Sequence, residues 1–197
     1  MSMSAADARY GSMNQRGVTL IEMVVVSAII VILAVAAGFA YQGWMGRYKM
    51  EKMSKELYTD LMNTRSLALT RSRMYFVTLI DANNYSVTED TNDSLVRGDT
   101  VGGVTDRVLA TYPKNIEYAF SWGGAVPANQ TVSFDKRGVM NIGGTICFNS
   151  DFNADGTDDV DPDYDCIVIS QTRIKMGRLT TRMSAGGACN AANCADR

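Results

Sequence analysis

An uncharged apolar run near the N-terminus most constrains how this chain can fold. Residues 23–39 carry no charged side chain, and Val, Ile, Leu, Ala and Met occupy most of the positions. With a few flanking residues the run approaches the roughly 20 residues that a helix needs to cross a hydrocarbon core. We therefore expect one transmembrane helix over residues 18–41. An acidic residue, Glu22, lies at its start, where a lone charge is costly unless a partner neutralises it.

The rest of the chain has room for one modest globular domain. At 197 residues, the chain can bury a core of its own in addition to the membrane helix. Lys and Arg number 19 against 21 for Asp and Glu, so the net charge of -2 gives no general attraction to nucleic acid. The sequence has no histidine, no nucleophile elbow and no phosphate-binding loop. We therefore expect no enzyme.

The residues before the apolar run are polar and include Arg9 and Arg16. Positive charge before a membrane helix favours a cytoplasmic position of that end, so the remainder is expected to be exported. Basic residues after the run, such as Arg47 and Lys49, argue weakly for the opposite orientation. No convincing small-residue cleavage site follows the run, so we expect the helix to be retained.

The residues at the start of the run resemble a known signal. Arg16 and Gly17 precede the string Val-Thr-Leu-Ile-Glu at residues 18–22, and the uncharged run follows directly. This order is similar to the class III signal of type IV prepilins and type II secretion pseudopilins. The resemblance implies a leader over residues 1–17, which a prepilin peptidase removes after Gly17. It also implies that Val18 becomes the N-methylated first residue.

The same resemblance gives Glu22 a partner. In a packed filament, its carboxylate can pair with the terminal ammonium of Val18 on an adjacent subunit. The alternative is an ordinary single-span anchor in which Glu22 is protonated or reaches toward the headgroups. The resemblance implies a single-pass protein of the bacterial inner membrane with a periplasmic C-terminal domain, which later joins other pilins in a pilus or pseudopilus.

The helix is expected to continue as an amphipathic segment over residues 42–72, because apolar residues recur there at three- and four-residue steps. Short β-branched and aromatic stretches follow, separated by turns, which predicts an antiparallel head domain over residues 73–197. The fold class is α+β, with a long N-terminal helix packed on a small β-sandwich-like head. Residues 89–106 are expected to form an exposed loop. Strands are expected at residues 74–80, 85–88, 107–112, 116–122, 130–134, 139–142, 144–148, 166–170 and 173–176.

Aromatic residues and glycines mark the middle of the expected helix. Tyr41, Trp44 and Tyr48 suit a membrane interface, and they suit packing between filament subunits equally well. Gly43 and Gly46 lie among them, and each glycine costs up to roughly 1 kcal/mol of helix stability relative to alanine. A bend or a local loss of helix is consistent with this composition.

Later segments narrow the resemblance. Three segments are similar to minor pilins of the GspH/FimT group. They are residues 63–72, residues 132–138, and residues 167–170, which precede a basic strand. The resemblance implies a minor subunit, in contrast to the major pilin that forms the bulk of a fibre.

An acidic segment in the head, residues 151–165, contains the first part of a calcium-binding loop. Oxygen-bearing residues alternate along it, and Gly156 stands where such a loop turns sharply. The final bidentate Glu is missing, because Pro162 stands there, so Asp161, Asp163 or Asp165 would complete the shell. A solvated acidic turn is the slightly favoured alternative, and no other cofactor is indicated. The candidate ligands are Asp151, Asn153, Asp155, Thr157 and Asp159.

Four cysteines, Cys147, Cys166, Cys189 and Cys194, lie late in the chain. An even number in an exported domain predicts disulfides. Three pairings are possible, and the simplest joins Cys147 to Cys166 around the acidic segment and Cys189 to Cys194. Four reduced thiols are the alternative. Zinc is not expected, because the chain has no histidine and no Cys-x-x-Cys pair.

A basic segment near the C-terminus is the candidate for nucleic-acid binding. Arg173, Lys175 and Arg178 lie on or beside an expected strand. Some FimT-like proteins contact DNA through a Gly-Arg-x-Arg string near the C-terminus, but the matching place here reads Thr-Arg-Ile-Lys at residues 172–175. Alternating cations can contact successive phosphates or guard an edge strand. We favour the edge strand, and DNA binding for natural transformation is the alternative function.

Overall fold

The computed structural model describes residues 17–153 and 155–196 of the chain. The predicted leader therefore lies outside the described residues, except for Gly17. Contacts divide the chain into two compact units, Met1–Tyr41 and Gln42–Arg197, and each unit is described here by itself.

One helix, α1 (Leu20–Arg71), contributes to both units. It is continuous over Gly43 and Gly46, so the local loss of helix that those residues suggest is not observed. Close packing against another segment explains why position 46 is a glycine. A Cβ atom at this position would come within 2.7 Å of Cγ1 of Val160, so glycine allows the acidic segment to approach the helix closely.

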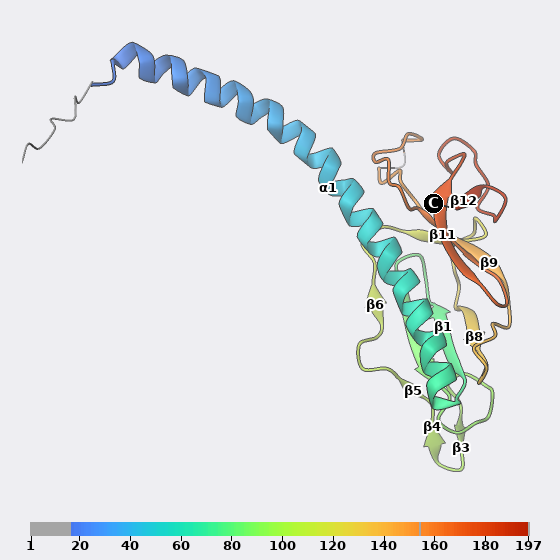
Figure 1. Cartoon of the computed structure of the whole chain (residues 1–197). Helices are drawn as coiled ribbons and strands as arrows, with labels where there is room; N and C mark the ends of the chain where they lie inside the picture. Colours follow the sequence, from blue (N-terminus) through green and yellow to red (C-terminus); the bar gives the residue numbers. More distant parts are fainter. Residues whose placement is uncertain (1–16, 154, 197) are drawn as a thin grey trace, which may run out of the picture. The chain divides into compact units, whose positions relative to one another are not determined.

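The first sheet packs along the second half of α1 (Figure 1). Its strands lie in the order β5-β2-β1-β8, with β6 also paired to β2, and all pairs are antiparallel. The strands β1 and β2 form the expected hairpin. The bounds are β1 (Tyr75–Leu79), β2 (Asn84–Glu89), β5 (Arg107–Val108), β6 (Lys114–Asn115) and β8 (Gln130–Phe134).

The second sheet has the antiparallel order β12-β11-β10-β9-β7. Its strands are β7 (Phe120–Trp122), β9 (Gly144–Phe148), β10 (Cys166–Ile169), β11 (Ile174–Leu179) and β12 (Cys194–Asp196). A separate hairpin is formed by β3 (Thr100–Val101) and β4 (Val104–Thr105). The helix packed on antiparallel sheets confirms the predicted fold class.

The strand predictions hold best where the apolar pattern is strong. The strands β8 and β9 have the predicted bounds, whereas residues 139–142 form only a bridge between Met140 and Phe134. The prediction of an exposed loop over residues 89–106 is wrong at its start, because Glu89 ends β2 and is buried. The same segment also contains the β3–β4 hairpin. The C-terminal strand β12 was not predicted.

The core of the second unit lies between α1 and both sheets. Met50, Leu57, Leu61 and Ala68 of α1 are fully buried, which is the three- and four-residue spacing expected for one helix face. Each large apolar side chain removed from water in this way contributes about 1.5–3 kcal/mol to folding. The sheets supply Tyr75, Leu79, Tyr85, Phe134, Ile146, Phe148, Ile167 and Ile169 to the same cluster.

The cysteines form a second, smaller cluster with Leu179 in the second sheet. The disulfides are Cys147–Cys189 and Cys166–Cys194, so the simplest pairing is wrong. Cys147 and Cys166 lie opposite each other on β9 and β10, which are already joined by the strand ladder. Each of them instead bonds to the C-terminal segment. The two bridges therefore hold that segment on the sheet.

Candidate functional site

The helix α1 begins with a cap inside the N-terminal signal. The backbone N–H of Glu22 lies 3.3 Å from Oγ1 of Thr19, and the N–H of Met23 donates to the carbonyl of Thr19 at 3.2 Å. Thr19 is thus the N-cap, and Glu22 is the third helical residue, as in a capping box. A carboxylate at this position also interacts favourably with the positive end of the helix dipole. Gly17 and Val18 lie directly before the cap in exposed, non-helical chain.

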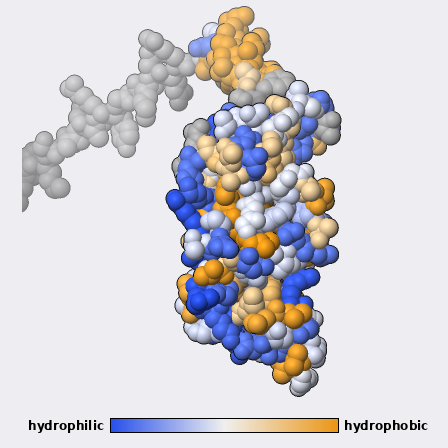
Figure 2. Space-filling model, turned by 90° about the vertical axis from the view of Figure 1, so that its right-hand side faces the viewer, coloured by the Kyte–Doolittle hydropathy of each residue, from blue (hydrophilic) through white to orange (hydrophobic). Residues whose placement is uncertain are grey.

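The apolar half of α1 exposes its side chains in the first unit. Large apolar residues from Leu20 to Val35 are between 47% and 82% exposed. Figure 2 shows this surface in orange. Within the described residues, α1 is the one helix long and apolar enough to cross a membrane. Apolar surface of this extent is unfavourable in water, so the segment requires a lipid or protein environment.

The sequence comparison decides what this segment is. Residues 12–38 match the family model of the prokaryotic N-terminal methylation motif. The chain carries this methylation motif. The match spans Gly17, Val18 and Glu22, the residues that carry the resemblance to the prepilin signal.

One solved structure is similar to the chain. It is the type IV minor pilin FimU of Pseudomonas aeruginosa strain PAO1, with a TM-score of 0.45 and 16% sequence identity. The likeness covers 74% of this chain and 96% of that chain. No curated protein matches the sequence.

In the head, the predicted calcium ligands accept hydrogen bonds from other residues of their own loop. The carboxylate of Asp151 accepts the backbone N–H groups of Asp155 and Gly156, at 3.2 and 2.9 Å. The hydroxyl and backbone N–H of Thr157 donate to Asp155 and hold the pKa of its carboxyl below the usual range. Asp159 accepts the backbone N–H of Phe152 at 2.7 Å. In the described part of the chain, no three acidic, histidine or cysteine side chains gather as a metal site. Calcium binding stays a prediction.

The end of the acidic segment is attached to α1. Arg47 pairs with Asp163 at 2.6 Å, and the backbone N–H of Asp163 donates to Glu51 at 3.0 Å. The hydroxyl of Ser54 donates to the carbonyl of Tyr164 at 3.1 Å. These contacts lie within about two turns of Gly46. They fix the acidic segment against the part of the helix where the glycine admits it.

The basic residues predicted to contact DNA are largely neutralised. Lys175 pairs with Asp196, and Arg178 pairs with Asp161. Arg173 is exposed and has no ion pair among the described residues. Arg182, which also faces Asp161, adds a contact to Asp158 at 3.5 Å. The structure therefore does not gather these cations into a positively charged surface.

Asp165, which the sequence suggests only as an alternative calcium ligand, is a buried carboxyl directly before β10. Its carboxylate accepts the backbone N–H of Leu179 at 2.6 Å. Only 1% of the residue is exposed. Burial disfavours the charged form and raises the pKa of Asp165 to about 6.

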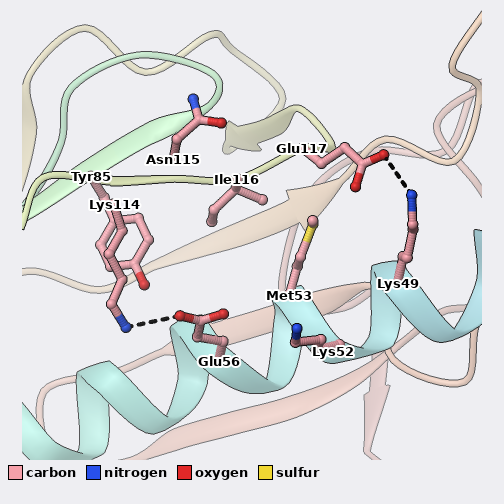
Figure 3. Close-up of a pocket in the computed structure, with 9 residues that line it drawn as sticks. All are labelled: Lys49, Lys52, Met53, Glu56, Tyr85, Lys114, Asn115, Ile116 and Glu117. Atoms are coloured by element: carbon pink, nitrogen blue, oxygen red, sulfur yellow. Dashed lines mark hydrogen bonds and ion pairs between the residues drawn. The ribbon is translucent and has the colours of Figure 1, made fainter.

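A cleft of about 290 Å³ lies between α1 and the segment around β6 (Figure 3). Ion pairs close both ends: Lys49 with Glu117 at 3.0 Å, and Lys114 with Glu56 at 2.9 Å. Burial opposes the charge of Lys114, but hydrogen bonds to Asp60 and Glu56 outweigh it and raise its pKa. The lining cations are thus largely compensated. The arrangement indicates a seam that joins the helix to the first sheet.

Proposed function

We propose that the chain is the precursor of a minor pilin or pseudopilin. It would enter a type IV pilus or a type II secretion pseudopilus as a structural subunit, after its leader is removed at Gly17. The observation that carries this proposal is the methylation motif over residues 12–38, followed by an apolar helix and a separate head. Before assembly, the subunit is held in the inner membrane with its head in the periplasm.

The proposed assembly contact joins Glu22 to the new N-terminus of a neighbour. After cleavage, Val18 carries an ammonium group close to the positive end of the helix dipole. A carboxylate of an adjacent subunit is attracted by both charges, and pairing removes two isolated charges from an apolar bundle. The apolar side chains of the first half of α1 then pack against the helices of neighbouring subunits.

Leader cleavage is tested by intact mass. We expect coexpression with a prepilin peptidase to remove residues 1–17 and to leave a methylated Val18. A Gly17→Val variant is the matched control and should keep its leader, because the bulkier side chain alters the cleavage site. A wild-type chain that keeps its leader beside a processed reference pilin would contradict the proposal.

The assembly role of Glu22 needs a separate measurement. We expect Glu22→Leu to insert into the membrane normally but to be recovered poorly in sheared filaments, because Val18 of the neighbour loses its partner. Ile21→Leu changes the neighbouring side chain without changing its charge, so it should assemble like the wild type. Equal recovery of the two variants would count against the pairing.

DNA uptake is not proposed as the function. Lys175 and Arg178 already pair with carboxylates of the same chain, so no observation favours the alternative. A gel-shift titration separates the two functions. DNA binding that weakens steeply with salt and with loss of Arg173 and Lys175 would favour the DNA-binding pilin.

A further inference from the structure

An exposed aromatic pair lies on α1 at the start of the second unit. The rings of Trp44 and Tyr48 stack, with 5.9 Å between their centroids and 17° between their planes. Trp44 is 61% exposed and Tyr48 is 54% exposed. The opposite side of the helix packs on the head, where Gly46 meets Val160 and Met50 is fully buried. Trp44 and Tyr48 therefore lie on the side of the helix that faces away from this packing.

The pair follows the apolar segment at the distance of a membrane interface. At about 1.5 Å of rise per residue, the helix from Leu20 to Tyr41 is roughly 32 Å long. A bilayer has a hydrocarbon core about 30 Å thick, with headgroup layers of several Å on each side. Trp44 comes three residues after Tyr41, so it falls in the headgroup layer when the segment spans the core. Tyr48 is one further turn along.

The chemistry of the two rings fits this layer. Trp and Tyr are enriched at membrane interfaces, because each combines an apolar ring with one polar N–H or O–H group.

We propose that Trp44 and Tyr48 form an interfacial anchor, which lies among the phospholipid headgroups while the subunit is stored in the membrane. The anchor fixes the depth at which α1 lies in the bilayer. This inference rests on the membrane-anchored precursor of the proposed function and not on the filament. A neighbouring subunit is the other conceivable occupant of this surface, and the experiment separates it from lipid.

Tryptophan fluorescence of the full chain in vesicles tests the anchor. The chain has two tryptophans, so the difference between the wild type and Trp44→Phe isolates the emission of Trp44. In vesicles of phosphatidylcholine and phosphatidylglycerol, we expect lipids brominated near the headgroup to remove most of this emission. Iodide in the water should remove little of it. Trp122 lies against Gly144 in the second sheet, so its emission should resist the brominated lipids.

A displaced tryptophan provides the matched control. Met62 is on α1 within the head and is partly exposed. Met62→Trp in the Trp44→Phe background should respond to iodide and not to brominated lipid, because it lies about 27 Å further along the helix than Trp44. Equal lipid quenching at both positions would show non-specific adsorption of the head and would overturn the anchor.

Flotation of the vesicles separates the possible failures. If the chain floats with the vesicles but iodide quenches Trp44, the anchor is wrong and the membrane-anchored precursor stands. If Trp44 is exposed to iodide in vesicles and protected only in assembled filaments, a neighbouring subunit is the occupant. If the chain does not float, the membrane-anchored precursor and the anchor are both wrong.

Discussion

The hydroxyl of Tyr85 donates to the carboxylate of Asp60 at 2.6 Å, and this hydrogen bond joins β2 to α1. Lys114 approaches the same carboxylate at 2.7 Å. We expect Tyr85→Phe to lower the free energy of unfolding by about 1–2 kcal/mol, because a partly buried acceptor loses one of its donors. Chemical denaturation of the full chain in detergent measures this loss.

The control for this variant is Tyr58→Phe. Tyr58 also packs against the core, but no hydrogen bond of its hydroxyl is found among the described residues. Loss of the Tyr58 hydroxyl should lower the free energy of unfolding much less than Tyr85→Phe does. An equal effect of the two variants would mean that the hydroxyl of Tyr85 contributes only through packing.

The disulfide pairing is tested by peptide mapping without reduction. Cleavage after basic residues and before aspartates places Cys147, Cys166 and the Cys189–Cys194 segment on three separate peptides. We expect one species that contains all three, because Cys147 and Cys166 each bond to the C-terminal segment. A species that joins only the peptides of Cys147 and Cys166 would contradict this pairing.

Paired substitutions identify the individual bridges. Replacing Cys147 and Cys189 together by serine should leave no free thiol, whereas replacing Cys147 and Cys194 should leave two. Removal of either bridge is expected to destabilise the folded chain by about 2–5 kcal/mol.

Asp165 should make stability depend on pH. An aspartate of the unfolded chain titrates near about 4, whereas burial raises the pKa of Asp165 to about 6 in the folded chain. The folded state therefore holds this proton more tightly. The resulting stabilisation is complete below about pH 4 and is lost as the pH rises through about 6.

The variant Asp165→Asn tests this pH dependence. Its amide oxygen can still accept the N–H of Leu179, but the side chain no longer ionises. At pH 7 we expect the variant to be more stable than the wild type by up to about 3 kcal/mol, and at pH 4 the difference should largely vanish. Unfolding curves at both pH values provide the measurement. A difference that is independent of pH would mean that the carboxyl is not the cause.

The sequence predicts the parts of this structure that depend on local pattern. The methylation motif is a contiguous string, and β8 and β9 are short apolar runs between turns, so both are recognisable without the fold. The disulfides and the burial of Glu89 depend on segments far apart in the chain. Glu89 is neutralised by Arg71 and Arg107, at 3.3 and 2.5 Å, and no local pattern brings these three residues together. Polar side chains that join distant elements are therefore the part of the site that pattern reasoning missed.

Calcium binding is tested by thermal unfolding. If Asp151, Asp155 and their neighbours rearrange around the ion, calcium at about 100 times its dissociation constant should stabilise the chain by about 2.7 kcal/mol. The melting temperature would rise accordingly, and Asp151→Asn should abolish the rise. Magnesium serves as the control, because it requires a smaller and more regular shell. An unchanged melting temperature in millimolar calcium would leave the segment as an acidic turn.

Gly46 and Gly43 form a matched pair for testing how closely the acidic segment approaches α1. Replacing either by alanine removes the glycine penalty of up to roughly 1 kcal/mol in a helix. At Gly43 a Cβ atom meets nothing within 4 Å, so Gly43→Ala should stabilise the chain. At Gly46 the new atom lies 2.7 Å from Val160, whose branched side chain has little freedom to move aside.

Gly46→Ala is therefore expected to destabilise the second unit by about 1 kcal/mol or more, because overpacking outweighs the gain in helix propensity. Val160→Ala should cost less stability in the Gly46→Ala background than in the wild type, because there it also removes the clash. Unfolding of these variants in detergent measures both effects. If Gly46→Ala and Gly43→Ala stabilise the chain equally, the acidic segment does not contact the helix at this glycine. Close packing would then not explain the glycine at position 46.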